Sequence, residues 1–337
     1  MRFPRPLVAT TVLMILFAAK MSFAQGVTVS KTEFSADGKR LTIEFNGRTA
    51  TIHRPVVPSS DFPVLGNVYW VATNGSNSHP GTQESPFKTI NKGVSVSGPG
   101  DIVYIKAGTY VENLQITKSG QDGMPIVISA APGAIGKVRI TPSSSYVGAN
   151  PGGAVIELNG AQHVWINGLV IEGPRGRPEA PSDETYGANG ITWSGGAGDG
   201  TRVTNNVVYD NVHCGMKEMG HEGRNILIAG NVIFANGFDT RDHGIYAPSD
   251  DTRIIGNILF LNTGWGIHSY KEPTGQLISR NISVANGFGG ILLAGNNTEV
   301  YHNIAAFQGW GIVCTGTGTC SFKMNASKTV SAKFNVR

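Results

Sequence analysis

The sequence lacks several features that would each indicate a different class of protein. The apolar run from Leu7 to Ala19 is too short to span a membrane, which takes roughly 20 apolar residues. Charged residues make up only 15% of the chain, a low share that fits an exported protein. The repeated segments described below show no helical period of 3.6 residues, which excludes a stack of helices.

The first residues are typical of a secretory signal peptide. Two arginines precede the apolar run, and small residues end the segment at Ala24, next to Gln25. We therefore predict that residues 1–24 are cleaved and that the protein is secreted or periplasmic, without a transmembrane segment. The segment carries three of the 27 basic residues and no acid, so 27 − 3 = 24 basic residues remain against 23 acidic ones. A net charge of +1 gives no reason to expect a nucleic acid partner.

One short pattern recurs between Gly190 and Ile312. Each copy begins with Gly and an apolar residue; these apolar residues are Ile191, Met216, Ile245, Ile267, Ile291 and Ile312. Their separations of 25, 29, 22, 24 and 21 residues indicate a stacked array. Short β-branched runs broken by Gly and Asn indicate that the coils are built of strands.

Two sets of asparagines recur at matching depth in these copies. The first set is Asn206, Asn231, Asn257, Asn281 and Asn303, and the second is Asn211, Asn236, Asn262, Asn286 with Gln308 in the last place. Stacked about 4.8 Å apart, such amides pass hydrogen bonds from coil to coil. We also expect these asparagines to adopt the αL conformation at the corners.

These columns resemble the asparagine ladders of the pectate-lyase-like superfamily. The resemblance implies an all-β fold, a single-stranded right-handed parallel β-helix over residues 68–313. The stretch from Tyr69 to Tyr110 is similar to the opening of secreted bacterial β-helix proteins, several of which are polysaccharide lyases. Within it, Ser85 followed by Pro86 predicts a short capping helix over the end of the first coil.

The two ends of the chain depart from the repeat. Residues 25–67 alternate like strands and then turn rich in proline, which predicts a small β segment and a linker, either covering the solenoid or separate from it. Residues 314–337 resemble part of a cystine-bearing β-hairpin repeat, which implies a disulfide between Cys314 and Cys320. Cys214 is then left as a buried, inert thiol.

The residue after each inward apolar residue should point outward. Lys217, Tyr246 and His268 occupy this position on three successive coils. We predict that these three and His243 are catalytic, and that the substrate-binding residues are Asn189, Arg241, Trp265 and Tyr270. An insertion at 173–188 and loops at 217–224 and 237–242 would wall this strip.

The strip favours a carbohydrate-active enzyme, and we predict a polysaccharide lyase that acts on a uronate polymer by β-elimination. Lys217 or His268 would be the base, Tyr246 the acid, and Asn189 or Arg241 the partner of the carboxylate. A C5-epimerase would use similar groups, and a glycoside hydrolase would need a carboxylate pair, for which Glu218 and Asp242 are the candidates.

A non-catalytic glycan-binding or cell-envelope protein is the alternative of another class. We expect a polysaccharide partner, a monomeric chain and no cofactor. No close cluster of aspartates supports a calcium site, and no residue is predicted to bind a metal.

Overall fold

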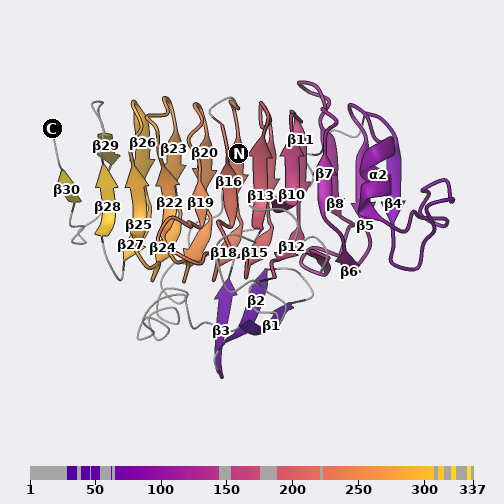
Figure 1. Cartoon of the computed structure of the whole chain (residues 1–337), viewed down its shortest axis with the longest axis horizontal. Coiled ribbons are helices and arrows are strands. Elements are labelled where there is room, and N and C mark those ends of the chain that lie inside the picture. Colours follow the sequence, from indigo (N-terminus) through magenta and orange to yellow (C-terminus); the bar gives the residue numbers. More distant parts are fainter. Residues whose placement is uncertain are drawn as a thin grey trace.

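The computed structural model describes residues 29–35, 39–45, 47–53, 62, 65–143, 153–174, 188–220, 223–306, 310–314, 320–323 and 332–334. The predicted signal peptide and Gln308 lie outside these residues, as does nearly all of the insertion. In the described part the chain winds into a right-handed parallel β-helix (Figure 1). The predicted fold is therefore confirmed.

A complete coil contributes one strand to each of three parallel sheets, in the order first, second, third sheet. In the described residues, β4 precedes the first complete coil, and β29 and β30 follow the last one. The first sheet holds β4 (Val68–Val71), β5 (Ile102–Ile105), β8 (Ile126–Ala130), β11 (Val164–Asn167), β14 (Arg202–Thr204), β17 (Leu227–Ala229), β20 (Arg253–Ile255), β23 (Leu277–Ser279), β26 (Thr298–Tyr301) and β29 (Cys320–Lys323). The second holds β6 (Gly108–Val111), β9 (Val138–Thr141), β12 (Leu169–Glu172), β15 (Val207–Tyr209), β18 (Val232–Phe234), β21 (Ile258–Phe260), β24 (Ile282–Val284) and β27 (Ile304–Ala306). The third holds β7 (Leu114–Ile116), β10 (Ala154–Asn159), β13 (Asn189–Ser194), β16 (Met216–Glu218), β19 (Ile245–Tyr246), β22 (Trp265–Ser269), β25 (Gly289–Leu293), β28 (Trp310–Cys314) and β30 (Ala332–Phe334).

Both asparagine columns form hydrogen-bonded ladders, which are buried except at the half-buried Asn303. In the first, at the corner between the first and second sheets, each amide donates to the next coil, as Asn231 Nδ2 does to Asn257 Oδ1 (2.9 Å) and Asn257 Nδ2 to Asn281 Oδ1 (3.0 Å). The second column does the same from Asn211 to Asn286 at the next corner. Each oxygen in the first ladder also accepts a backbone N–H of the preceding coil. The ladders thus satisfy the polar groups that a sharp buried corner exposes.

The expectation that these asparagines adopt the αL conformation was wrong. The residue just before each one carries the positive φ instead: Asn205, Gly230, Gly256, Arg280 and His302 in the first column, and Asp210, Ala235, Leu261 and Ala285 in the second. The preceding residue therefore makes the bend, and the ladder asparagine is left free to point its amide into the coil.

The helix near the start of the solenoid begins later than predicted. It is α2 (Ile90–Val96), and its N-cap is Thr89, whose side chain accepts from Lys92 N. Ile90 and Val94 are buried in the main core, and α2 lies beside β4 and β5 at one end of the stack (Figure 1). Ser85 and Pro86 precede the helix in a loop, so the predicted cap was misplaced by one turn.

The N-terminal strands cover one flank of the solenoid. β1 (Val29–Phe34), β2 (Arg40–Phe45) and β3 (Arg48–His53) form an antiparallel sheet. Its Leu41, Ile43 and Ile52 join one buried cluster with the outer face of the second sheet. There Tyr209, Phe234 and Phe260 stack on successive coils, with ring centroids 5.1 and 4.9 Å apart. The sequence left open whether this segment covers the solenoid or is separate from it; in the structure it covers the solenoid.

The C-terminal strands continue the solenoid. β29 pairs in parallel with β26, and β30 in parallel with β28. The two therefore lie in different sheets and form no hairpin with each other, which corrects the assignment of residues 314–337 to a cystine-bearing hairpin repeat. The side chains of Cys314 and Cys320 lie outside the described part, so their disulfide stays a prediction. Across the described residues, no helix is long and apolar enough to cross a membrane.

We expect Asn257→Ala to destabilise the protein severely. Asn257 is fully buried, and its amide bonds to two neighbouring asparagines, Ile228 O and Asn231 N. Each buried group left without a partner costs about 1–3 kcal/mol, so the loss should exceed about 3 kcal/mol in urea denaturation. Asn74→Ala, at an exposed turn, is the control. A loss below 1 kcal/mol for Asn257→Ala would contradict the structural role of the ladder.

We also expect Ile43→Asn to detach the N-terminal sheet. Ile43 is fully buried against the second sheet, and an amide there has no hydrogen-bonding environment. The uncovered aromatic stack should then bind a hydrophobic dye such as ANS at native conditions. Thr49→Asn places the same side chain on the exposed side of β3 and should leave dye binding at the wild-type level. Equal dye binding by both variants would show that the sheet does not protect this face.

Candidate functional site

The third sheet brings the predicted column together. Thr192, Lys217, Tyr246, His268 and Leu292 are register partners on successive strands β13, β16, β19, β22 and β25. Their inward neighbours, such as Met216 and Ile245, are fully buried in the core. Adjacent members of the column are therefore separated by one rung, about 4.8 Å.

A cavity of about 280 Å³ lies beside the middle of this column. It is lined by Cys214, Lys217, Glu218, Met219, Gly220, Arg241, Tyr246 and Lys271. Met219 and Gly220 come from the loop after β16, and Arg241 comes from the loop before β19, two of the loops predicted to wall the strip. Three basic side chains thus face one small space together with a phenol.

Two histidines form a hydrogen-bonded pair behind Tyr246. The backbone N–H of Trp265 donates to Nδ1 of His243 (3.1 Å), so a neutral His243 carries its proton on Nε2. That Nε2 lies 2.6 Å from Nδ1 of His268. His243 therefore donates and His268 accepts, which leaves the proton of a neutral His268 on Nε2.

Burial keeps this pair uncharged. It lowers the pKa of His243 well below its usual value, with a further lowering from His268 and Lys217. It also lowers the pKa of His268 to about 4. At neutral pH His268 is thus a hydrogen-bond donor through Nε2, an atom that is buried and has no partner in the structure. This protonation state disfavours the predicted role of His268 as a base.

Two tyrosines flank His268, and Tyr246 is the one that lines the cavity. The Tyr246 ring meets the His268 ring edge-on at 5.3 Å between centroids, and Tyr270 lies 5.1 Å from His268. Burial, followed by the neighbouring Tyr270, raises the pKa of Tyr246, so its hydroxyl keeps its proton at neutral pH. Tyr270 is 47% exposed and offers a ring for stacking on a sugar.

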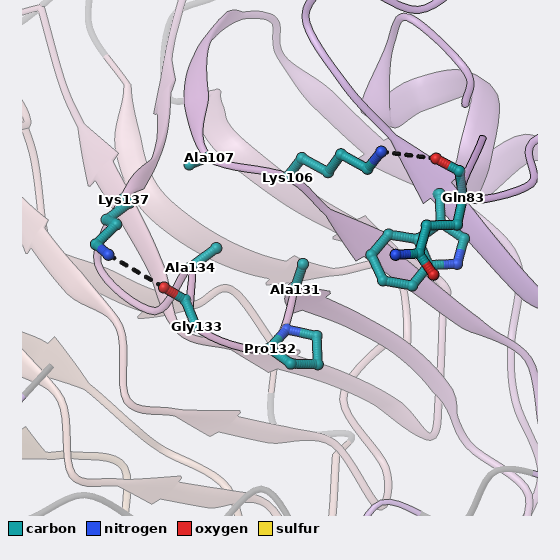
Figure 2. A pocket seen from close by; sticks show the side chains of 9 residues that line it. Gln83, Lys106, Ala107, Ala131, Pro132, Gly133, Ala134 and Lys137 are labelled. Carbon is teal, nitrogen blue, oxygen red and sulfur yellow. Dashed lines mark hydrogen bonds between the residues drawn. The ribbon is translucent and has the colours of Figure 1, made fainter. Parts of the chain in front are cut away.

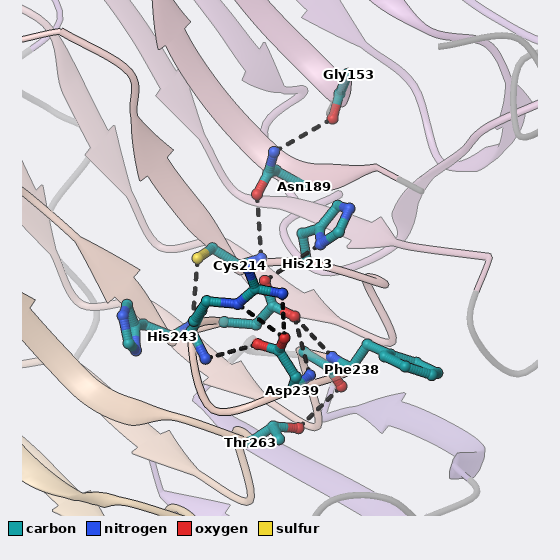
Figure 3. A network of polar contacts seen from close by, with 11 residues as sticks. Gly153, Asn189, His213, Cys214, Phe238, Asp239, His243 and Thr263 are labelled. Carbon is teal, nitrogen blue, oxygen red and sulfur yellow. Dashed lines mark hydrogen bonds and ion pairs between the residues drawn. The ribbon is translucent and has the colours of Figure 1, made fainter. Parts of the chain in front are cut away.

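Two predicted substrate-binding residues lie away from the cavity. Asn189 is fully buried; its Oδ1 accepts from Cys214 N, and its Nδ2 donates to Gly153 O (Figure 3). Trp265 is also buried, with its ring against Phe288. Both positions precede the glycine of the repeat, where the chain turns into the coil. Asn189 and Trp265 therefore support the packing of the coils and do not line the cavity.

Several residues near the site escaped the sequence analysis. Lys271 lines the cavity from a turn in which it and Glu272 both have positive φ, 65° and 56°, a strained conformation for long side chains. His213 contacts Asp242 Oδ1 through Nδ1 (3.2 Å). Neither belongs to the repeat pattern, so no periodic signal marked them.

Arg241 is held at the rim of the cavity. Its guanidinium pairs with Asp239 at 2.6 Å. Asp242, next in sequence, accepts the backbone N–H groups of Phe238 and Asp239 and thereby shapes this loop.

Cys214 is a buried thiol, as predicted. Its Sγ accepts the backbone N–H of His243, and burial raises its pKa to about 12. A thiol of this kind is not a nucleophile at neutral pH.

The carboxylate pair considered for hydrolysis is poorly placed. Glu218 points into the coil with 3% of its surface exposed and accepts the Ser249 hydroxyl. Asp242 is also buried and engaged with the loop backbone. Among the residues that the structure describes, no group of three or more His, Cys, Asp or Glu side chains is arranged to hold a metal ion.

Comparison with known proteins agrees with the fold. The family described as "Protein of unknown function (DUF1565)" matches residues 73–291. Uncharacterized protein YwoF of Bacillus subtilis is 28% identical over 158 residues, 47% of this chain and 31% of its own. Pectate lyase L of Dickeya dadantii is 21% identical over 280 residues, 74% of this chain and 60% of its own. The chain thus spans less than two thirds of these curated relatives.

Among solved structures, pectate lyase Pel9A aligns with a TM-score of 0.55 and 16% identity, over 80% of this chain and 74% of its own. At this identity the alignment shows a shared β-helix fold and nothing about the reaction.

We expect His268 to make the protein sensitive to acid. The pKa of His268 is about 4 in the folded protein and about 6.5 in the unfolded chain. At a pH between these values, His268 is protonated in the unfolded chain and neutral in the folded protein, which favours unfolding. Stability is therefore full above pH 6.5 and falls by roughly 2 kcal/mol toward pH 4.5. In urea denaturation, the free energy of unfolding of His268→Gln should fall less than that of the wild type between pH 6.5 and 4.5.

The exposed His53 provides the control, because His53→Gln should keep the acid sensitivity of the wild type. An equal acid loss in His268→Gln and wild type would contradict the buried neutral pair. His268→Ala would leave the Nε2–H of buried His243 unpaired, at a cost of about 1–3 kcal/mol.

Proposed function

The chain belongs to the family "Protein of unknown function (DUF1565)", and we propose that it is a polysaccharide lyase that cleaves an acidic polysaccharide by β-elimination. The observation that carries this proposal is the cavity beside the third sheet, where Lys217, Arg241 and Lys271 surround Tyr246. A site with two cations at Arg241 and Lys271, the amine nitrogen of Lys217 and one protonated phenol suits a sugar carboxylate next to a reacting C–H bond. Glu218 also lines the cavity, and its buried carboxylate accepts the Ser249 hydroxyl. The relative named as a pectate lyase, which acts on an acidic polysaccharide, supports the same class.

In the proposed reaction the uronate carboxylate faces Arg241 and Lys271. These charges stabilise the enolate-like anion that forms when the proton α to the carboxylate leaves. The amine nitrogen of Lys217 takes that proton. The C–O bond at the β position then breaks, a double bond forms in the ring, and Tyr246 gives its proton to the departing oxygen.

The order of the column suits this assignment. Lys217 and Tyr246 are register partners on adjacent rungs, so both reach a single sugar ring. His268 then serves by packing its ring edge-on against Tyr246, and His243 fixes the tautomer of His268. Tyr270 would stack on a neighbouring sugar.

Two other functions, C5-epimerase and glycan-binding protein, would each give a different result in an assay for the unsaturated product. A C5-epimerase would return a proton to the opposite face of the ring and yield no unsaturated sugar. A glycan-binding protein would bind the polymer and leave it intact. The buried Glu218 and Asp242 give no support to a hydrolase.

We expect Lys217→Met and Tyr246→Phe each to lower turnover about 100- to 10,000-fold, because each removes a positioned base or acid. Turnover is followed on pectate and alginate by the ultraviolet absorbance of the unsaturated product. Tyr246→Phe keeps the ring contact with His268, so its thermal midpoint should stay close to that of wild type.

Leu292→Ala is the matched control. Leu292 follows His268 in the same column and does not line the cavity, so turnover should be unchanged within about twofold. Wild-type turnover by both Lys217→Met and Tyr246→Phe would refute the assignment of base and acid. Binding of these polymers without any unsaturated product from the wild type would refute the lyase.

A further inference from the structure

A second cavity opens at the other end of the solenoid. It measures about 540 Å³ and lies at the corner between the first and second sheets, in the coils of β4, β5 and β8. Its lining is Trp70, Gln83, Lys106, Ala107, Ala131, Pro132, Gly133, Ala134 and Lys137 (Figure 2). Nothing in the candidate site described above shares a residue with it.

The local sequence explains why the corner is open here. From β14 onward, the coils turn this corner in two residues, with a ladder asparagine in the second place. Between β8 and β9 the chain instead makes a wide turn from Ala131 to Lys137, with Gly133 (φ 78°) and Gly136 (φ 75°) in the left-handed region. The turn bulges outward, and its small residues leave room that a ladder corner would fill.

The cavity is held by packed neighbours. A Cβ on Gly136 would lie 2.5 Å from the Phe34 ring, so β1 packs directly against the turn. On the far side, Trp70 and Tyr104 are register partners with ring centroids 5.2 Å apart. These contacts fix both walls before any ligand arrives, which lowers the entropic cost of binding.

The charges in the lining are all of one sign. Lys106 and Lys137 are its ionisable residues, and no carboxylate lines it. Lys106 Nζ donates to Gln83 O (2.6 Å) and lies 5.7 Å from the Trp70 ring centroid, while Lys137 Nζ donates to Gly133 O (3.2 Å). Figure 2 shows the two lysines on either side of the turn Ala131–Ala134. An ammonium has three donors, so each has capacity left for an anion.

We propose that this cavity is a second carbohydrate-binding site, which takes a sugar residue bearing a carboxylate. The sugar's apolar face would stack on Trp70, and Lys106 and Lys137 would bind its carboxylate or that of the next residue. The volume is in the range of small-ligand sites, which is roughly 300–1,000 Å³. The site would hold an acidic polymer to the protein and take no part in bond breaking.

The experiment measures binding to the Tyr246→Phe variant, so that any substrate survives. The probes are size-defined oligogalacturonate and oligoalginate, with a neutral β-glucan oligosaccharide of equal length, in calorimetric titration. At least one acidic probe should bind, and the neutral one should bind at least about tenfold more weakly. Adding Lys106→Met and Lys137→Met should weaken acidic binding at this site at least about tenfold, because two charge-assisted contacts are lost.

The control adds Lys88→Met and Lys118→Met, two exposed lysines outside the cavity, and should leave the affinity unchanged within about twofold. Trp70→Phe tests the platform with less risk to folding than alanine, and should weaken binding in the same direction. Equal loss in the control pair, no loss in the cavity pair, or equal affinity for the neutral probe would each overturn the proposal.

The outcome is separable from that of the lyase proposal. The Lys106→Met, Lys137→Met pair on the otherwise wild-type chain should keep the turnover of short oligosaccharides. A protein without lyase activity would still show the acidic binding lost in this pair, and an active lyase without that binding would refute this site alone.

Discussion

The amide hydrogen bond between stacked asparagines is the interaction on which the rest of this structure depends. From Asn231 to Asn303, each ladder oxygen in the first column accepts both an amide and a backbone N–H of its neighbour. One side chain therefore fixes the height and the register of two coils at once. A slip of one residue would bury outward side chains and break every bond in the column. The alignment of Lys217 with Tyr246 and His268 on the outer surface is therefore set by asparagines inside the coil, on other corners of the molecule.

This dependence explains what the sequence could predict. The repeat of Gly, apolar residue and Asn has a period that only stacked coils satisfy, so the fold and the register of the column followed from it. Asn189 and Trp265 were misjudged because their position precedes a glycine where the chain turns inward, and burial there depends on the coils above and below. Lys271 and His213 lie in corners outside the repeat. The match between β1–β3 and the second sheet also has no local signal, because it joins residues far apart in the chain.

The three faces of the solenoid are used differently. The second sheet carries stacked aromatic rings on its outer side and is covered by the N-terminal strands. Its cover also reaches the wide turn at Gly136, so a packing element and a ligand cavity share one support. The third sheet instead presents its outward column to a cavity lined by loops of neighbouring coils. The outward side chains of each sheet thus decide its use. Aromatic residues on the second sheet are covered by the N-terminal strands, and polar residues on the third sheet face a cavity.

Burial of a histidine pair beside Lys217 has a consequence for the charge of the candidate site. A protonated His268 would lose its contact with water, which opposes protonation. Its low pKa, about 4, keeps the imidazole of His268 uncharged at neutral pH. The neutral pair then offers a directed N–H at His268, since the backbone of Trp265 fixes the tautomer of His243 and His243 fixes that of His268. The main chain of β22 thus determines which nitrogen carries the proton in both rings. These tautomers are fixed only while both rings stay buried.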